Sequence, residues 1–309
     1  MCFWSCLLGL LLWISACSGP ATTLRPTPPE PPRQPHAVAT APAAPTPPTA
    51  APTIKIATFN VQVFGRTKAF KPDVMSRLIA TIHKYDVVAL QELKDASGEA
   101  PRLLLAALNR DAARSYAMLL SHRSGLEPDD ARSQEQYAIL YDTQVIEALA
   151  GERLFDDSAR DLFQREPYLA RLRTRAGSFS FVLMNIHTRP ERAVAEIAAL
   201  HDVFDWAKLA FPDEENFIAL GDYNAACRYA TPAELDSLSI RRPDYFWIVP
   251  DDSDSNVSPA SACAYDRIVV TAATSRAFTG RWGVDRAFND KLVSDHWPVW
   301  AEFSVAYAR

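Results

Sequence analysis

Short apolar runs rich in β-branched residues alternate with stretches of helical periodicity, and this alternation constrains the fold more than any other feature. Seven such runs predict buried strands: IKIATF, DVVALQ, YAILY, SFVLMNIH, NFIALGD, DRIVVT and WPVWAEF. Between them, PDVMSRLIATIHKY and ERAVAEIAALHDVFDWAKLAF repeat apolar residues at intervals of three and four, which is typical of amphipathic helices. No internal linker separates these elements, so the sequence predicts a single α/β domain over residues 54–309.

The N-terminal residues lie outside this alternation and divide into two segments. Residues 1–17 contain the uncharged apolar run MCFWSCLLGLLLWISA, which is typical of a secretory signal and short for a membrane span. The following ISAC resembles a bacterial lipobox, so we expect Cys17 to carry a lipid; a simply cleaved signal and an uncleaved anchor are the alternatives. Residues 18–53 hold twelve of the 23 prolines and predict an extended tether.

The composition of the 309-residue chain is that of a globular protein, with 48% hydrophobic and 22% charged residues. Its 37 acidic and 32 basic residues give a net charge of −5, and no long basic run is present. This excludes a protein that holds nucleic acid by bulk positive charge. An acidic chain can still act on phosphates if its carboxylates hold divalent cations.

Polar side chains recur where the predicted strands end. A single Asp or Asn at such a position usually caps a turn, and a lone His on a strand is usually a structural residue. Their recurrence on successive strands points instead to the oxygen and imidazole groups of a site for divalent metal and acid–base chemistry. The residues are Asn60, Glu92, His187, Asp222, Asn224, Asp266, Asp295 and His296.

Several of these segments resemble the signature segments of a known superfamily. IKIATFNVQVFG, VVALQELKD, GDYNAAC, CAYDRIVV and SDHWPV resemble, in this order, those of the endonuclease/exonuclease/phosphatase superfamily. FQREP and IHTRPERAVAEIAALHDVF narrow the resemblance to the deoxyribonuclease I family, over about residues 54–304. The resemblance implies an α/β four-layer sandwich: two mixed β-sheets packed face to face, helices on the outside, and the active site where the strands end.

The resemblance also implies a role for individual residues. His187 and His296 match the two catalytic histidines of the family, and Glu135 and Asp266 match the carboxylates that orient them. Glu92 matches the main metal-binding carboxylate, for Mg²⁺ or Mn²⁺. The residues matching positions around the metal and the scissile phosphate are Asn60, Asp222, Asn224 and Asp295, with Arg165 and Asn224 contacting phosphate.

Elementary chemistry supports this assignment independently. Hydrolysis of a phosphodiester needs a base for the attacking water, an acid for the leaving oxygen, and positive charge near the non-bridging oxygens. Two histidine–carboxylate pairs and a divalent cation would supply all three. Together with the resemblance and the N-terminal segment, this predicts an exported, monomeric DNA endonuclease, either a cell-envelope lipoprotein held to the membrane by its lipid anchor or a secreted protein. A phosphodiesterase or phosphatase acting on sphingomyelin or phosphoinositides and a non-catalytic surface binding protein are the alternatives.

Two further features follow from the resemblance. Cys227 and Cys263 match the disulfide of the family, with two free buried thiols as the alternative. The segment DDSARDLFQREP matches a structural Ca²⁺ site, with solvated loop acids as the alternative. Its expected ligands are Asp157, Asp161, the carbonyl of Phe163 and Glu166. A second Ca²⁺ site of the family would lie near Asp254, but its Thr-rich ligand run is altered here and we do not expect it.

The chain departs from duplex-cutting relatives at two positions. Those proteins often carry an aromatic residue where this chain has Ser133 and an arginine where it has Gln62, while Lys94 keeps a positive charge where they often have arginine. Loss of a stacking ring and a guanidinium predicts a weak grip on duplex DNA, with a high KM and little sequence preference. The longer loop SHRSGLEPDDARSQ offers compensation through Arg123 or Arg132.

Overall fold

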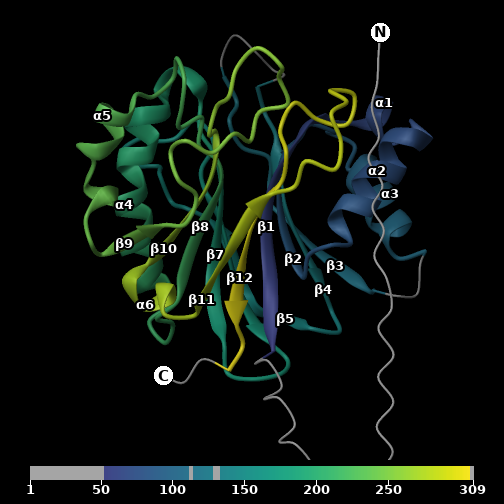
Figure 1. The fold of residues 1–309 in the computed structure, drawn as a ribbon. Helices are drawn as coiled ribbons and strands as arrows, with labels where there is room; N and C mark the ends of the chain where they lie inside the picture. Colours follow the sequence, from purple (N-terminus) through teal and green to yellow (C-terminus); the bar gives the residue numbers. More distant parts are fainter. Residues whose placement is uncertain (1–51, 111–113, 128–132, 307–309) are drawn as a thin grey trace, which may run out of the picture. The chain divides into compact units, whose positions relative to one another are not determined.

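The fold is built on two mixed β-sheets of six strands each (Figure 1). The computed structural model describes residues 52–110, 114–127 and 133–306. In pairing order, the first sheet contains β11 (Phe278–Val284), β12 (Val299–Ser304), β1 (Thr53–Phe64), β2 (Val87–Leu93), β4 (Gln136–Asp142) and β3 (Tyr116–Leu120). The second contains β5 (Ile146–Leu154), β6 (Tyr168–Thr174), β7 (Ser180–His187), β8 (Phe217–Asp222), β10 (Asp266–Thr271) and β9 (Tyr245–Trp247). Both are mixed because β1 runs parallel to β2, and β7 to β8.

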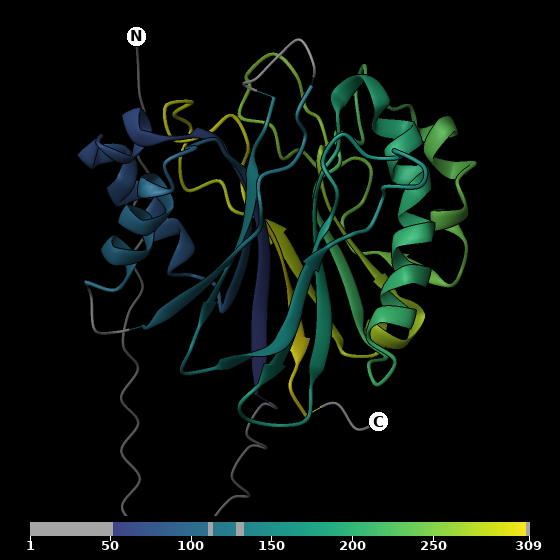
Figure 2. The ribbon, with the colours of Figure 1, turned by 180° about the vertical axis from the view of Figure 1, so that it is seen from behind.

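Helices cover the outer face of each sheet (Figures 1 and 2). They are α1 (Arg66–Ala69), α2 (Pro72–Ile82), α3 (Glu99–Leu108), η1 (Pro190–Arg192), α4 (Ala193–Ala210), α5 (Pro232–Asp236), η2 (Ser239–Arg241) and α6 (Ala272–Ser275). Leu78 of α2 and Leu104 of α3 are buried against the first sheet. Ile197 and Phe204 of α4 are buried against the second. The four-layer α/β sandwich expected from the sequence is confirmed.

The space between the sheets is filled by buried apolar side chains, and polar side chains also bridge it. Nε2 of Gln91 in β2 donates a hydrogen bond to Oδ1 of Asn185 in β7 at 2.6 Å, and both residues are fully buried. Because a buried amide costs free energy unless it is hydrogen-bonded, this pair fixes how the two sheets face each other. Gln91 precedes Glu92, and Asn185 lies two residues before His187, so the bridge supports the strand ends that carry both.

All seven predicted strands are present, and the sequence pattern missed five others: β3, β5, β6, β9 and β11. Four of these are the edge strands of the two sheets. Edge strands are often short or charged and lack the continuous apolar run of a central strand. In β6 the apolar residues alternate with Arg171 and Arg173, which pair with Glu214 and Glu147. The last predicted strand begins at Val299 rather than at 297, because proline 298 has no amide hydrogen to donate.

The predicted signal and lipobox, with Cys17, lie outside the described residues, as does nearly all of the predicted tether. Among the helices of the described part of the chain, none is long and apolar enough to cross a membrane.

Candidate active site

The second sheet places three candidate residues in one row. His187 is the last residue of β7, Asp222 is the last of β8, and Asp266 is the first of β10. In the strand register Asp222 lies opposite both of the others. Gly221 permits this close pairing, because at its φ of 155° an added Cβ atom would lie 1.8 Å from the carbonyl oxygen of Ile186.

The first sheet contributes Asn60 from β1 and Glu92 from β2. The stretch of β1 that follows Asn60 is irregular. The prediction that this strand ends at Asn60 is wrong, since β1 continues to Phe64 after a shift of register against β2. Gln62 and Val63 have φ angles of 42° and 50°, and the bulge lets the Val63 amide donate to Oε2 of Glu92 at 2.7 Å. Such a bulge changes the direction of a strand locally. Through this hydrogen bond the bulge of β1 holds the Glu92 carboxylate of the neighbouring strand β2 at the end of the sheet.

The amide of Asn60 joins the two sheets at the site. Its Nδ2 donates to Oε1 of Glu92 and to Oδ2 of Asp222, both at 3.0 Å. Asn60 and Asp222 are both buried. One asparagine thus fixes the position of a carboxylate from each sheet.

The Asp222 carboxylate lies at the centre of the site. Its Oδ2 atom is 3.5 Å from Nε2 of His187 and 3.5 Å from Nε2 of His296. Burial alone would raise the pKa of Asp222, but the imidazoles of His296 and His187 hold that pKa below its ordinary value. His187 at the end of β7 and His296 in the segment before β12 therefore direct the same ring nitrogen toward one point.

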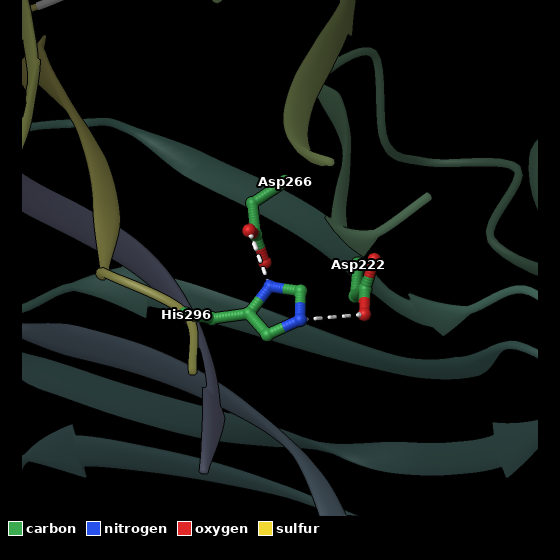
Figure 3. A group of neighbouring side chains, drawn as sticks. All are labelled: Asp222, Asp266 and His296. Carbon is green, nitrogen blue, oxygen red and sulfur yellow. Dashed lines mark hydrogen bonds and ion pairs between the residues drawn. The ribbon is translucent and has the colours of Figure 1, made fainter. Parts of the chain in front are cut away.

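Asp266 and His296 form one buried pair (Figure 3). Nδ1 of His296 lies 2.8 Å from Oδ2 of Asp266, which also accepts a hydrogen bond from the Ser255 hydroxyl at 2.6 Å. Burial raises the pKa of Asp266, although His296 opposes this. Burial would lower the pKa of His296, but Asp266 and Asp222 raise it well above its ordinary value. The pair therefore holds its proton tightly.

Glu135 and His187 form the second pair. Nδ1 of His187 lies 2.6 Å from Oε1 of Glu135, which is also 3.0 Å from Nε of Arg165. Nζ of Lys94 lies 3.1 Å from the other carboxylate oxygen. Burial alone would raise the pKa of Glu135, but His187, Arg165 and Lys94 together hold it well below its ordinary value. This carboxylate is therefore held in its charged form.

The remaining candidates lie near this centre. The amide of Asn224 donates to Oδ1 of Asp222, and its side chain donates to the carbonyl of Thr188. Asp295 is half-buried beside His296, and its charge contributes to the raised pKa of that imidazole. Arg165 is buried, and its guanidinium donates to backbone carbonyls as well as pairing with Glu135.

Oxygen donors in this arrangement can hold a cation. Asp222, Asp266 and His296 place ligand atoms within 4.8 Å of one another. Asp266 is bonded to Nδ1 of the imidazole, whereas Asp222 faces Nε2 (Figure 3). Asp266 is therefore better placed to orient the ring than to share an ion with Nε2. Asp222 and the nearby Glu92, bridged by Asn60, offer the carboxylate oxygens that Mg²⁺ prefers.

The expected disulfide is present between Cys227 and Cys263, with a Cα–Cα distance of 5.7 Å.

In the expected calcium segment, Oδ2 of Asp157 accepts a hydrogen bond from the amide of Phe163 at 2.7 Å. Oδ1 of Asp157 and Oε2 of Glu166 are buried without a hydrogen-bond partner among the described residues. Both side chains line a cavity of about 480 Å³ that Asp161 also lines.

The positions that depart from duplex-cutting relatives are engaged within the protein. The Ser133 hydroxyl donates to the carbonyl of Gly125 at 2.5 Å, so this side chain is enclosed by its own loop. Gln62 belongs to the β1 bulge, and Lys94 is paired with Glu135. Arg123 donates to the carbonyl of Gln134, and residue 132 lies outside the described residues.

Sequence reasoning missed three residues that hold the site together. Ser255 bonds to Asp266, and the Ser294 hydroxyl donates to the Asn60 carbonyl at 2.6 Å. Lys68 is buried, its ammonium donates to two carbonyls of the β1 bulge, and burial lowers its pKa to about 8. Only Ser294 carried a signal, because it immediately precedes the Asp–His pair in SDHWPV.

A four-layer sandwich with acidic and imidazole groups at its strand ends defines a class of phosphoesterases. The profile of the Endonuclease/Exonuclease/phosphatase family matches residues 57–296, and the chain belongs to this family. Solved structures with the same fold include an endonuclease/exonuclease/phosphatase family protein from Bacteroides thetaiotaomicron and the human Nocturnin catalytic domain. Their TM-scores are 0.56 and 0.54, their sequence identities 15% and 14%, and the matches cover 84% and 82% of this chain and 98% and 95% of theirs.

Curated relatives narrow the assignment. Deoxyribonuclease-1 of Homo sapiens is 32% identical over 271 residues, which cover 81% of this chain and 92% of that protein. Deoxyribonuclease gamma of Rattus norvegicus is 31% identical over 275 residues, which cover 84% of this chain and 86% of that protein. Within the superfamily, the chain therefore belongs to the deoxyribonuclease I family, and the expected enzyme class, a deoxyribonuclease I-like endonuclease, is confirmed at the level of the family.

Proposed function

We propose that this protein is an exported, divalent-metal-dependent endonuclease that hydrolyses the phosphodiester bonds of DNA. One observation carries the proposal: both histidines direct Nε2 at the same oxygen of Asp222, 3.5 Å from each, while each Nδ1 is bonded to its own buried carboxylate. Two imidazoles directed at one point suit a reaction that needs a proton acceptor and a proton donor together. The named relatives, both deoxyribonucleases, favour DNA as the substrate.

The carboxylates set the tautomers of the two histidines. Glu135 and Asp266 accept from Nδ1, so Nε2 is the nitrogen that faces the substrate. One Nε2 would take a proton from the attacking water, and the other would donate a proton to the leaving oxygen. Each partner of this kind typically contributes about 10²–10⁴-fold in rate.

Glu92 and Asp222, bridged by Asn60, would hold the divalent cation, Mg²⁺ or Mn²⁺. The carboxylate oxygens of Glu92 accept from Asn60 and Val63, and each oxygen keeps a further lone pair for an ion. When bound, such an ion supplies positive charge to the non-bridging phosphate oxygens. Asp295 and Asn224 border this position, and Arg165 and Asn224 would contact the phosphate.

Supercoiled plasmid tests the proposal directly. We expect the purified full chain to nick and linearise plasmid with Mg²⁺ or Mn²⁺ and Ca²⁺, and to leave it intact with EDTA. The His296→Ala chain purified in parallel is the control for a contaminating nuclease. No cleavage of plasmid, together with hydrolysis of sphingomyelin or of a phosphoinositide, would overturn the choice of DNA and favour the lipid alternative.

We also propose a structural Ca²⁺ in the segment with Asp157, Asp161, the Phe163 carbonyl and Glu166. Asp157 and Glu166 support it, since each has a buried oxygen with no hydrogen-bond partner in the described part of the chain and both line a cavity. A buried carboxylate oxygen without a donor is costly, and a cation would satisfy it.

For the N-terminus, we propose that Cys17 is lipidated and that residues 18–53 tether the enzyme to the cell envelope. The ISAC motif and the proline-rich composition support this. Labelled palmitate should be incorporated into the full chain expressed in a bacterium and be lost in Cys17→Ser. Absence of label from the unmodified chain would favour simple secretion.

A further inference from the structure

The bulge of β1 presents two neighbouring peptide units to the candidate metal site. The amide of Gln62 donates to Oδ1 of Asn60 at 2.8 Å, and the amide of Val63 donates to Oε2 of Glu92 at 2.7 Å. Because Asn60 also donates to Glu92, both amides act on the carboxylate that is proposed to hold the cation. The orientation of these two peptide units therefore decides where that carboxylate lies.

The ammonium of Lys68 holds the opposite side of the same two peptide units. Its Nζ donates to the carbonyls of Val61 and Gln62, at 2.7 Å each. The Val61 carbonyl belongs to the peptide unit that carries the Gln62 amide, and the Gln62 carbonyl belongs to the unit that carries the Val63 amide. In a planar trans peptide the C=O and N–H bonds point in opposite directions. A cation on both carbonyls therefore directs both amides away from itself and toward the site.

The bulge needs such support because its backbone is strained. Gln62 and Val63 have φ angles of 42° and 50°, in the left-handed region. A β-branched residue such as Val63 is strongly disfavoured there, and a conformation of this kind persists only where its surroundings hold it. The ammonium also polarises the two peptide units, which strengthens the hydrogen bonds that their amides donate.

The side chain of Lys68 is buried at a cost. It is 9% exposed, and burial lowers its pKa to about 8, although the negative charges of Asp295 and Glu92 oppose this. Its ammonium forms no ion pair with a carboxylate of the described residues, and the two carbonyls of the bulge accept its hydrogen bonds. What offsets the cost of burying this charge is therefore the bulge.

We propose that Lys68 is a positioning residue that sets the affinity of Glu92 for the divalent cation by orienting the two peptide units of the bulge. It acts on the ion through the backbone and through the Glu92 carboxylate. This role rests on the proposed function, since it requires a cation at Glu92.

The sign of the effect distinguishes this role from a simple charge effect. A positive charge near a cation site repels the ion, so removal of an ammonium that acted only through its charge would tighten metal binding. Removal of an ammonium that orients the bulge would weaken metal binding, because the Val63 amide would no longer hold Glu92 in place.

Binding of Mn²⁺ tests the role without any substrate. Lys68→Met in the full chain keeps a side chain of similar length and removes the ammonium. Lys71→Met is the matched control, because it removes an exposed ammonium in the same segment. Bound Mn²⁺ is measured by electron paramagnetic resonance, and the fraction lost in Glu92→Gln defines the site. We expect Lys68→Met to bind Mn²⁺ there about 10–100-fold more weakly, as is typical when a hydrogen-bond partner of a metal ligand is lost, and the control to be unchanged.

The amide resonance of Val63 reports on the backbone itself. In a chain with isotope-labelled valine, this resonance is assigned by its absence in Val63→Ile. An amide proton bonded to a carboxylate resonates downfield, so we expect the resonance to move upfield in Lys68→Met and to stay in place in Lys71→Met. If thermal melting shows that Lys68→Met is unfolded, Lys68→Gln, whose amide is neutral but still polar, takes its place with the same two readouts.

Two results would overturn the role of Lys68. One is an Mn²⁺ affinity and a Val63 resonance equal to those of Lys71→Met, which would leave Lys68 a purely structural residue. The other is tighter binding of Mn²⁺, which would show that the ammonium acts through its charge alone. Absence of Mn²⁺ from Glu92 in the unmodified chain would instead refute the metal dependence of the proposed function, and the Val63 resonance would still decide whether Lys68 orients the bulge.

Discussion

The two histidine–carboxylate pairs have the same geometry but opposite surroundings. Glu135, the partner of His187, has cationic neighbours, Arg165 at 3.0 Å and Lys94 at 3.1 Å. Asp266, the partner of His296, accepts a hydrogen bond from the Ser255 hydroxyl and lies near the negative charge of Asp222. Its second oxygen is buried without a hydrogen-bond partner among the described residues.

The surroundings move the two carboxylates in opposite directions. Cations hold the pKa of Glu135 below its ordinary value, whereas burial raises the pKa of Asp266. In the Glu135–His187 pair the carboxylate therefore keeps its negative charge. The Asp266–His296 pair holds its proton more tightly. Geometry alone would have suggested two interchangeable pairs, and the neighbouring charges show that they differ.

The pairs also depend on different parts of the chain. Arg165, which holds Glu135, lies between the expected calcium ligands Phe163 and Glu166. Ser255, whose hydroxyl donates to Asp266, lies instead near the disulfide. Its backbone amide donates to the carbonyl of Cys263 at 3.1 Å. We therefore expect calcium to support one pair and the disulfide to support the other.

Removing either histidine should have the largest effect. We expect His187→Ala and His296→Ala each to reduce the rate of plasmid nicking by about 10²–10⁴-fold, because each removes one proton-transfer partner. Thermal melting of each variant checks that the domain still folds. A variant that nicks within tenfold of the unmodified chain would show that its pair does not take part in proton transfer.

Neutralising the carboxylate of each pair should lower the free energy of unfolding by different amounts. Glu135→Gln leaves Arg165 and Lys94 buried or half-buried without their partner, and we expect it to lower the free energy of unfolding by about 3–5 kcal/mol. Asp266→Asn removes the partner of His296, but an imidazole can release its proton where an arginine or lysine cannot, and we expect a loss of about 1 kcal/mol. Urea unfolding at neutral pH measures both. Equal losses would mean that the cations around Glu135 do not distinguish the pairs.

The pH dependence sharpens the same comparison. The pKa of Glu135 is lower in the folded state, so its stabilising contribution is complete above its ordinary value of 4.5 and is lost as the pH falls toward the folded value. The stability difference between the unmodified chain and Glu135→Gln should therefore shrink below about pH 4.5. The pKa of Asp266 is raised, so its contribution changes in the opposite sense, and the difference for Asp266→Asn should not shrink on acidification.

The disulfide should stabilise the part of the domain that holds Asp266. Its two cysteines are 36 residues apart, and in the chain-entropy model the loop contributes about 3–4 kcal/mol. We expect Cys227→Ser with Cys263→Ser to lower stability by up to this amount in urea unfolding, while the response to calcium persists. Mass spectrometry of the unreduced chain that finds two free thiols would contradict the premise.

Removing calcium should weaken the surroundings of Glu135, because Arg165 lies between two of the expected calcium ligands. An ion that binds only the folded state, present at about 100 times its Kd, stabilises by about 2.7 kcal/mol, so a chelator should lower Tm by several degrees. Asp157→Asn should abolish this response. Asp156→Asn is the matched control, since that neighbouring carboxylate is exposed and bonded to Ser158. Equal chelator responses in both variants would place the ion elsewhere.

Much of the fold could be predicted because the central strands leave a local signal. β7 and β8 are buried on both faces, so their sequences are continuous apolar runs that end in His187 and Asp222. The edge strands leave a weaker signal because one side faces solvent. The bulge at Gln62 and Val63 leaves none, since it arises from the pairing of β1 with β2 and from the buried ammonium of Lys68.

The sequence by itself determined which chemical groups the strand ends carry and, through their order, the family to which the chain belongs. It could not determine how Asn60 joins Glu92 to Asp222, because Asn60 and Asp222 are 162 residues apart in the chain. Nor could it distinguish the two pairs, since each Nδ1–carboxylate contact has the same local chemistry. Their difference comes from Arg165, Lys94 and burial, which only the packing of the two sheets brings to within a few ångströms. Electrostatic energies depend on distance and desolvation, and both are decided by the tertiary structure.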